Sequence, residues 1–184
     1  GQHHPDAVAS IAAAGHEVGM HGWVHEIWDT LDPTEERAIV AKATAAITAA
    51  AGSAPVGFRA PGGNRTEETE ALLREHGYQF DASLGDGMRP ARLPGGLPNV
   101  PFVWPGVDGY WYLRPEPPDP MVVRDAWLAA LETAAETDRL FLLICHPFIT
   151  GVDAARCDAL EAVIERALAD RRIEAVSYTH LRAH

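Results

Sequence analysis

Short apolar runs alternate with longer segments of helical pattern along this chain, and that alternation most constrains its fold. The helical patterns cover residues 6–14, 33–51, 66–76, 121–137 and 153–169. The strand-like runs cover residues 17–20, 56–59, 78–81, 140–145 and 173–176, with a brief one near 100–104. Strands that are separated by helices pair in parallel through crossovers. The sequence therefore predicts one α/β domain over residues 1–176, because no segment has the character of a linker.

The helix expected at residues 33–51 has the clearest local boundaries. Asp32 precedes Pro33, which suits an N-cap followed by proline at the first helical position, and Gly52 follows as a stop signal. By contrast, residues 85–101 are rich in proline and glycine, and we expect a loop there.

Two histidines, His21 and His25, stand in the run H-G-W-V-H-E at residues 21–26. Four-residue spacing on one helical turn brings two imidazoles to the same side, and neutral imidazoles are common zinc ligands. The strand-like run at 17–20 leads directly into the pair, and active-site residues favour the carboxyl ends of strands. The pattern predicts a metal site, with chance pairing among nine histidines as the alternative.

Three further motifs follow, each at the end of a strand-like run. They are R-A-P at 59–61, D-A-S-L at 81–84 and H-P at 146–147. In this order the four motifs resemble the polysaccharide deacetylase family (NodB homology domain, carbohydrate esterase family 4), and most closely its peptidoglycan-deacetylase and allantoinase-like branch. The resemblance spans residues 4 to about 177. It implies a distorted (β/α)7 barrel that lacks its first strand.

The resemblance also implies roles for four residues. His21 and His25 match the histidines that hold a divalent metal ion, with zinc expected. His146 matches the general acid that protonates the leaving nitrogen, and an imidazole suits this role because it titrates near neutrality. Arg59 matches the residue that orients the base carboxylate. The alternatives are a structural, hydrogen-bonded histidine at 146 and a surface salt bridge at Arg59.

Candidate substrate-binding residues are mainly aromatic, because aromatic faces pack on apolar sugar surfaces. They are Trp23, Pro61, Trp104, Trp111 and Phe148. The alternative is that these side chains are part of the core. For Asp81 and Ser83 we favour a structural role, a turn held by side-chain hydrogen bonds to the backbone.

The two ends of the chain depart from the family pattern. The family carries an acidic motif on its first strand that supplies one metal ligand and the general base, and nothing precedes Gly1 here. We therefore expect that the chain is a gene fragment that lacks these carboxylates, and that this fragment has no catalytic activity. Residues 177–184 lack helix or strand periodicity and resemble translated sequencing adapter, so we expect a non-native tail.

The composition of the chain limits the classes of molecule that it is expected to bind. The formal net charge of -11 disfavours binding to nucleic acid or to an anionic membrane, because like charges repel. No apolar run approaches the roughly 20 residues of a membrane span. Cys145 and Cys157 do not form a disulfide framework and are expected as free thiols. Oligomeric state stays open, and the compartment stays open between the cytoplasm and the cell envelope.

Taken together, the motifs predict a metal-dependent hydrolase that removes N-acetyl or O-acetyl groups from a polysaccharide such as peptidoglycan or chitin. The alternatives are an allantoinase-like hydrolase of a small C–N substrate and a non-catalytic carbohydrate-binding relative. Its partner is expected to be a glycan or a small amide.

Overall fold

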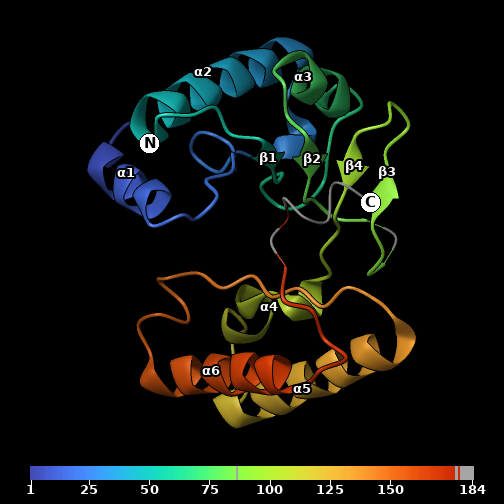
Figure 1. The fold of residues 1–184 in the computed structure, drawn as a ribbon. Helices are drawn as coiled ribbons and strands as arrows, with labels where there is room; N and C mark the ends of the chain where they lie inside the picture. Colours follow the sequence, from blue (N-terminus) through green and yellow to red (C-terminus); the bar gives the residue numbers. More distant parts are fainter. Residues whose placement is uncertain (86, 177, 179–184) are drawn as a thin grey trace. The chain divides into compact units, whose positions relative to one another are not determined.

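The computed structural model of the chain describes residues 1–85, 87–176 and 178. The chain forms two compact units (Figure 1). Unit 1 comprises Gly1–Gly85, Pro90–Pro101 and Tyr178–His184. Unit 2 comprises Asp86–Arg89 and Phe102–Ser177.

Unit 1 combines helices with a small mixed sheet. Its helices are α1 (Pro5–Ala13), the 3-10 helix η1 (Trp28–Thr30), α2 (Pro33–Ala51) and α3 (Thr69–Glu75). Its strands are β1 (Gly57–Phe58), β2 (Phe80–Asp81), β3 (Ala91–Arg92) and β4 (Pro98–Asn99). The sheet order is β1-β2-β4-β3, in which β2 runs parallel to both β1 and β4, and β3 is antiparallel to β4. Met20 extends this sheet by a parallel bridge to Phe58.

Helix α2 has the bounds that the sequence predicts. The Asp32 side chain accepts hydrogen bonds from the backbone N–H groups of Thr34 and Glu35, at 2.8 and 2.9 Å. At the other end, Gly52 adopts a left-handed conformation with φ of 78°. Such caps satisfy backbone groups that the helix itself leaves unpaired.

The core of unit 1 lies between α2, α3 and the sheet. Its buried hydrophobic residues are Met20, Trp28, Val40, Ala43, Phe58, Ala60, Leu73, Tyr78 and Leu97. Gly57 is required in β1, because a Cβ atom there would overlap the ring of Phe80 on the neighbouring strand. Glycine permits this close approach of backbone and aromatic ring.

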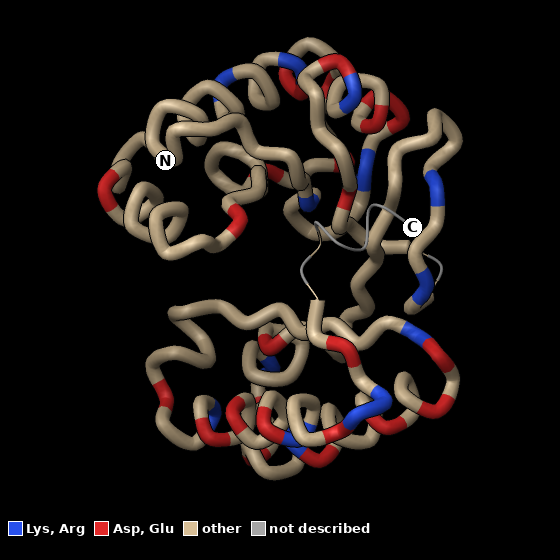
Figure 2. Tube along the Cα trace, viewed as in Figure 1, with Lys and Arg blue, Asp and Glu red and all other residues tan. Residues whose placement is uncertain are grey.

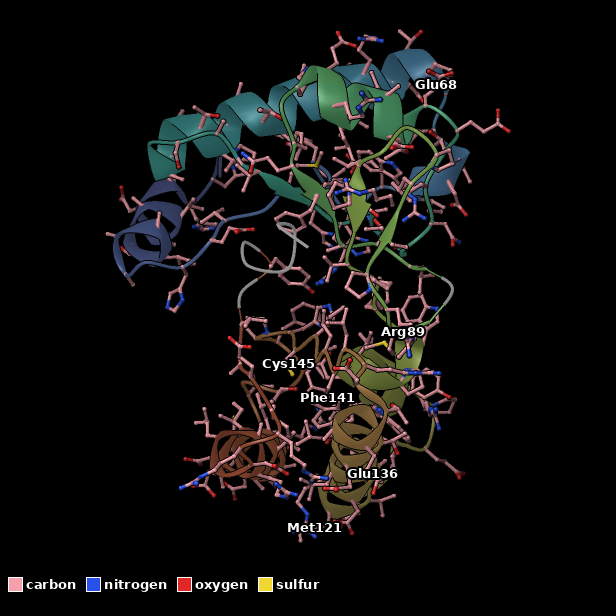
Figure 3. The ribbon with its side chains drawn as sticks, turned by 45° about the vertical axis from the view of Figure 1, so that its right-hand side comes forward. Glu68, Arg89, Met121, Glu136, Phe141 and Cys145 are labelled. Atoms are coloured by element: carbon pink, nitrogen blue, oxygen red, sulfur yellow. The ribbon has the colours of Figure 1, made fainter. Side chains whose placement is uncertain are left out.

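Unit 2 is mainly helical. It contains η2 (Trp104–Gly106), α4 (Asp108–Tyr112), α5 (Pro120–Thr137) and α6 (Ala154–Ala169). The Asp119 and Asp153 side chains cap α5 and α6. The core consists of Tyr112, Val123, Trp127, Leu131, Ile149 and Val163. Phe141 and Cys145, labelled in Figure 3, pack against this core from the segment that precedes His146.

The α/β class is confirmed, but several predicted strands are wrong. The segments 17–20 and 140–145 pair at single positions, Met20 with Phe58 and Ile144 with Val107. In the described part of the chain, residues 173–176 form no strand. The expected loop at 85–101 contains the β3–β4 hairpin, whose second strand ends at Asn99. In place of the brief strand expected near 100–104, the described residues form a single bridge at Phe102, and η2 begins at Trp104. Single pairings do not make strands, because a ladder needs consecutive bonded residues.

The predicted seven-stranded barrel stays a prediction, since the described sheet has four strands. Most of the predicted tail, 177 and 179–184, lies outside the described residues. Acidic positions lie along the helices of both units (Figure 2), in keeping with the net charge of -11. None of the helices in the described ranges has both the length and the apolar composition needed to cross a membrane.

Candidate active site

His21 and His25 lie in a loop between Met20 and η1, not on a helical turn as their spacing suggested. Their rings nevertheless meet edge to face, with centroids 5.0 Å apart and an interplanar angle of 81°. His25 has a φ of 62°, a left-handed conformation that is uncommon for residues other than glycine. The geometry of this loop, and not helical periodicity, brings the two imidazoles together.

The ring of His21 is oriented by the segment that follows β1. Its Nδ1 lies 2.8 Å from the carbonyl oxygen of Arg59, which can only accept a hydrogen bond. Nδ1 is therefore the protonated nitrogen when the imidazole is neutral, and Nε2 carries the lone pair. This arrangement, in which one ring nitrogen bonds a backbone carbonyl, is typical of metal-binding histidines.

Glu26 shapes the same loop and was not among the predicted site residues. Its Oε2 accepts a hydrogen bond from the backbone N–H of Trp23 at 2.9 Å, and its Oε1 accepts one from Val24 at 3.1 Å. Burial raises the pKa of this carboxyl, but the backbone hydrogen bonds and the charge of His25 outweigh burial, so the pKa lies below its ordinary value. Glu26 is therefore a carboxylate at neutral pH.

The Arg59 side chain reaches the D-A-S-L segment. Its Nε donates to the carbonyl oxygen of Ala82 at 2.9 Å, and an Nη donates to the hydroxyl of Tyr178 at 2.5 Å. The predicted role of Arg59, orienting a base carboxylate, stays a prediction. The backbone carbonyl of Arg59 accepts the hydrogen bond from His21 Nδ1 and so orients that ring.

Asp81 and Ser83 lie in a buried hydrogen-bond network, which contains side-chain to backbone bonds of the expected kind from Ala60 N–H to Ser83 Oγ and from Ser83 N–H to Asp81 Oδ2. Asp81 is fully buried and accepts hydrogen bonds from Ser83 Oγ at 2.6 Å, Asn99 Nδ2 at 2.6 Å and Arg65 Nη1 at 2.7 Å. Ser83 Oγ in turn accepts from the N–H of Ala60 at 2.8 Å. Burial raises the pKa of Asp81 despite these partners. The network ties the R-A-P segment to β2 and β4.

Trp23 and Pro61, two candidate substrate-binding residues, both pack within unit 1. Lys42 of α2 places its ammonium 3.8 Å from the centroid of the Trp23 ring, so one aromatic face is covered. Pro61 is buried beside Gly22 of the histidine loop. Lys42 thus contacts the histidine loop through Trp23, which belongs to the loop, and Pro61 packs against it at Gly22.

In unit 2, His146 is held by a buried carboxylate that sequence reasoning missed. His146 Nδ1 lies 2.5 Å from Asp108 Oδ1, and the backbone N–H of His146 donates to Asp108 Oδ2 at 2.7 Å. The Thr150 hydroxyl donates to the same Oδ2 at 2.7 Å. Asp108 is fully buried, whereas the His146 side chain is 32% exposed. The carboxylate thus fixes the imidazole and leaves Nε2 as the outward nitrogen.

The remaining aromatic candidates lie in unit 2. Phe148 is 69% exposed, and its ring centroid lies 5.3 Å from that of His146. Trp104 is 43% exposed. Trp111 is half-buried and donates its Nε1 hydrogen to the carbonyl oxygen of Pro105 at 2.8 Å. Phe148 is the candidate in direct reach of a predicted catalytic group.

Cys145, next to His146, is poorly suited to act as a nucleophile. Burial, followed by the negative charge of Asp108, raises the pKa of its thiol to about 11. Cys145 and Cys157 are both free thiols, as the sequence predicts. We assign Cys145 to packing against the core of unit 2.

The imidazoles of His21 and His25 form only part of the ligand set that a metal ion needs. Across residues 1–85, 87–176 and 178, no group of three or more His, Cys, Asp or Glu side chains is placed to hold a metal ion. His21 and His25 would contribute two nitrogen ligands, and the bond from His21 to Arg59 suits such a role. The pair thus supplies fewer protein ligands than a typical zinc site uses.

The structure brings His21, His25, Arg59 and Pro61 together in unit 1, and places His146 with Phe148 in unit 2. Sequence reasoning missed Glu26 and Asp108. Glu26 directly follows His25 in the sequence, so its position beside the histidine pair could have indicated a role in the site. Asp108 lies 38 residues before His146, and no local pattern links the two.

Comparison with known proteins identifies relatives of this chain. Residues 1–80 match the polysaccharide deacetylase family model. Over 74 residues, 40% of the chain, the sequence is 38% identical to a peptidoglycan deacetylase from Helicobacter pylori, and over 80 residues, 44% of the chain, it is 35% identical to the peptidoglycan deacetylase-like protein FGM2 from Gibberella zeae. These matches span about a quarter of each relative, 25% and 24%.

Solved structures resemble the chain over nearly all its length. A structure from Mycobacterium smegmatis described as a polysaccharide deacetylase has a TM-score of 0.90 and 30% identity, covering 98% of this chain and 66% of that one. The structure of Puue allantoinase has a TM-score of 0.86 and 23% identity, covering 100% of this chain and 63% of that one. At 23% identity, the similarity to the allantoinase structure shows a shared fold.

Proposed function

This chain belongs to the polysaccharide deacetylase family, and we propose that it forms part of a metal-dependent hydrolase that removes N-acetyl or O-acetyl groups from a polysaccharide such as peptidoglycan or chitin. The observation that carries the proposal is the pairing of a half-buried imidazole, His146, with the buried carboxylate of Asp108. The convergent rings of His21 and His25 support it.

In this proposal His21 and His25 hold a divalent metal ion, for which zinc suits the imidazole ligands. When bound, such an ion supplies Lewis-acid polarisation of a carbonyl and lowers the pKa of coordinated water. The residue His21 would bind the ion through the lone pair on its Nε2 atom. The hydrogen bond from Nδ1 to the Arg59 carbonyl fixes that tautomer.

His146 is proposed as the general acid. Its Nδ1 is engaged by Asp108, so a second proton on the ring would reside on Nε2 and could be transferred to a departing amine nitrogen. The buried carboxylate stabilises the imidazolium before transfer and keeps the ring in one orientation. Thr150 shares the Asp108 carboxylate and helps to hold it in place.

A neutral glycan is the proposed substrate class. The chain's charge of -11 disfavours polyanionic polymers, and Phe148 offers an exposed aromatic face next to His146. We further propose that the complete domain has the distorted barrel architecture that the family resemblance implies.

A second candidate is hydrolysis of a small C–N substrate of the allantoinase kind. It is favoured by the likeness in fold to the allantoinase structure over the whole chain. The histidine pair does not separate the two candidates. Acetate release from an N-acetylated oligosaccharide would support the first, and hydrolysis of allantoin without acetate release would support the second.

The decisive experiment compares His146→Ala and His25→Ala in the complete gene product, with acetate release and bound metal measured for each. A general acid contributes roughly 10²- to 10⁴-fold to rate without bonding the ion, so His146→Ala should lower kcat and retain metal. His25→Ala should lose both, because removing a ligand weakens the hold on the ion.

Asp108→Asn provides a matched test of the dyad, since it keeps the shape of the side chain and removes its charge. It should lower kcat while metal content stays at the wild-type level. Loss of metal from His146→Ala, or near-normal rates in both histidine variants, would overturn the assignment. A wild-type protein that binds oligosaccharide without hydrolysing any amide would indicate the non-catalytic alternative.

A further inference from the structure

The loop between His21 and His25 is closed by a side chain outside the histidine pair. The carboxylate of Glu26 accepts hydrogen bonds from two successive backbone N–H groups, those of Trp23 and Val24. These amides belong to residues that lie between the two histidines. We propose that Glu26 is a positioning residue that sets the separation of the two imidazoles before any ion is bound.

Gly22 is the residue that lets the carboxylate come so close. Its φ is 73°, and a Cβ atom built on it would lie 2.5 Å from Glu26 Oε2 and 2.9 Å from Pro61 Cγ. Any larger residue would therefore push the carboxylate out or displace Pro61. The close approach links the closed loop to the R-A-P segment, which also holds His21.

The two imidazoles are fixed in different ways. His21 is held directly, by its hydrogen bond to the Arg59 carbonyl. His25 stands at a φ of 62°, a left-handed conformation that strains a residue with a side chain and persists only where the surroundings enforce it. Glu26 is the next residue, and its bonds to Trp23 and Val24 bend the chain back at that point. Glu26 therefore controls the position of His25 relative to His21.

The chain contains a matched control. Glu70 of α3 also accepts two backbone N–H groups with one carboxylate, from Gly95 at 2.8 Å and Leu97 at 2.9 Å. That carboxylate joins α3 to the β3–β4 turn, and these contacts do not involve the histidine loop. Glu26→Ala and Glu70→Ala thus remove the same kind of interaction from two different loops.

The first arm of the test needs no metal. Hydrogen exchange, followed by NMR, should show the Trp23 and Val24 amides protected in the wild type. Glu26→Ala should abolish that protection, Glu26→Gln should retain part of it because its amide oxygen still accepts, and Glu70→Ala should leave it unchanged. Equal protection in the wild type and in Glu26→Ala would overturn the proposal.

The second arm rests on the proposed function and uses Co²⁺ as the probe. Glu26→Ala should weaken Co²⁺ binding by about 10- to 100-fold, the range typical when groups that orient metal ligands are removed, and Glu70→Ala should not. Equal losses in the two variants would overturn the role of Glu26 in the site. If the wild type binds no Co²⁺, the proposed metal role fails, while the exchange arm still decides whether Glu26 closes the loop.

Discussion

Replacing Arg65 with methionine removes a guanidinium that lies 2.7 Å from the buried carboxylate of Asp81. The Asp81 side chain is fully buried and that of Arg65 is 23% exposed, so water cannot replace the lost partner well. Ser83 and Asn99 would remain as hydrogen-bond donors to the carboxylate. The variant therefore measures how much stability the protein loses when the buried Asp81 carboxylate of the D-A-S-L motif is left without the positive charge of Arg65.

The expected loss is about 3 kcal/mol of unfolding free energy at pH 7. Breaking a buried ion pair on one side costs about 3 to 5 kcal/mol, and the two remaining donors place Asp81 at the lower end. A smaller part of the loss comes from the hydrogen bond of Arg65 to the Leu84 carbonyl, which contributes about 1 kcal/mol.

The loss should shrink in acid, and the sign follows from the raised pKa of Asp81, for which burial is the largest cause. A carboxyl whose pKa is higher in the folded than in the unfolded state favours folding most below its unfolded pKa, near 3.8. That contribution is lost as pH rises through the folded pKa. Removing Arg65 raises the folded pKa further, so the difference between variant and wild type grows with pH.

Urea denaturation followed by tryptophan fluorescence, at pH 7 and near pH 3.5, measures this difference. At the lower pH only about 1 kcal/mol should remain, because the raised pKa of Asp81 leaves its carboxyl mostly protonated in the folded protein, so that most of the charge attraction to Arg65 is lost. Arg37→Met is the control, since its ion pair with Glu75 is exposed and should contribute little at either pH. An equal loss for Arg65→Met at the two pH values would refute the reasoning.

Two further predictions concern unit 2. At pH 8 iodoacetamide should modify the exposed Cys157 well before Cys145, whose pKa of about 11 leaves it roughly 100-fold less thiolate than an ordinary cysteine; mass spectrometry of the native protein gives the order, and faster modification of Cys145 would contradict it. Tyr112→Phe should leave the free energy of unfolding unchanged or raise it by about 1 kcal/mol, because within the described residues the buried hydroxyl has no hydrogen-bond partner. Urea denaturation measures the effect, and a clear loss of stability would show that the hydroxyl has a partner in solution.

The sequence predicts best those features that local residues determine. Helix α2 begins and ends where Asp32, Pro33 and Gly52 indicate, because caps act within one helical turn. The strands are predicted less well, since pairing depends on partners far away in the chain. Met20 and Ile144 have the apolar neighbours of strand residues, yet each bridges its partner at a single position.

The same distinction applies to the candidate site. The proximity of His21 and His25 was predicted from their spacing, but the spacing suggested a helix where Glu26 closes a loop. Asp108 could not be predicted as the partner of His146, because only folding brings these distant positions together. Local pattern identified the imidazoles, and tertiary structure was needed to identify the groups that hold them.

The contact of Lys42 with Trp23 has a practical consequence for binding measurements. Lys42 is the only lysine in the sequence, so amine-reactive dyes and amine coupling to a sensor surface can attach only there and at the N-terminal amine. Attachment at Lys42 removes the cation from the indole face, next to the histidine loop. Immobilisation by this route would tether the protein beside the site under study, whereas a single dye at Lys42 would be close enough to Trp23 to report when the loop moves.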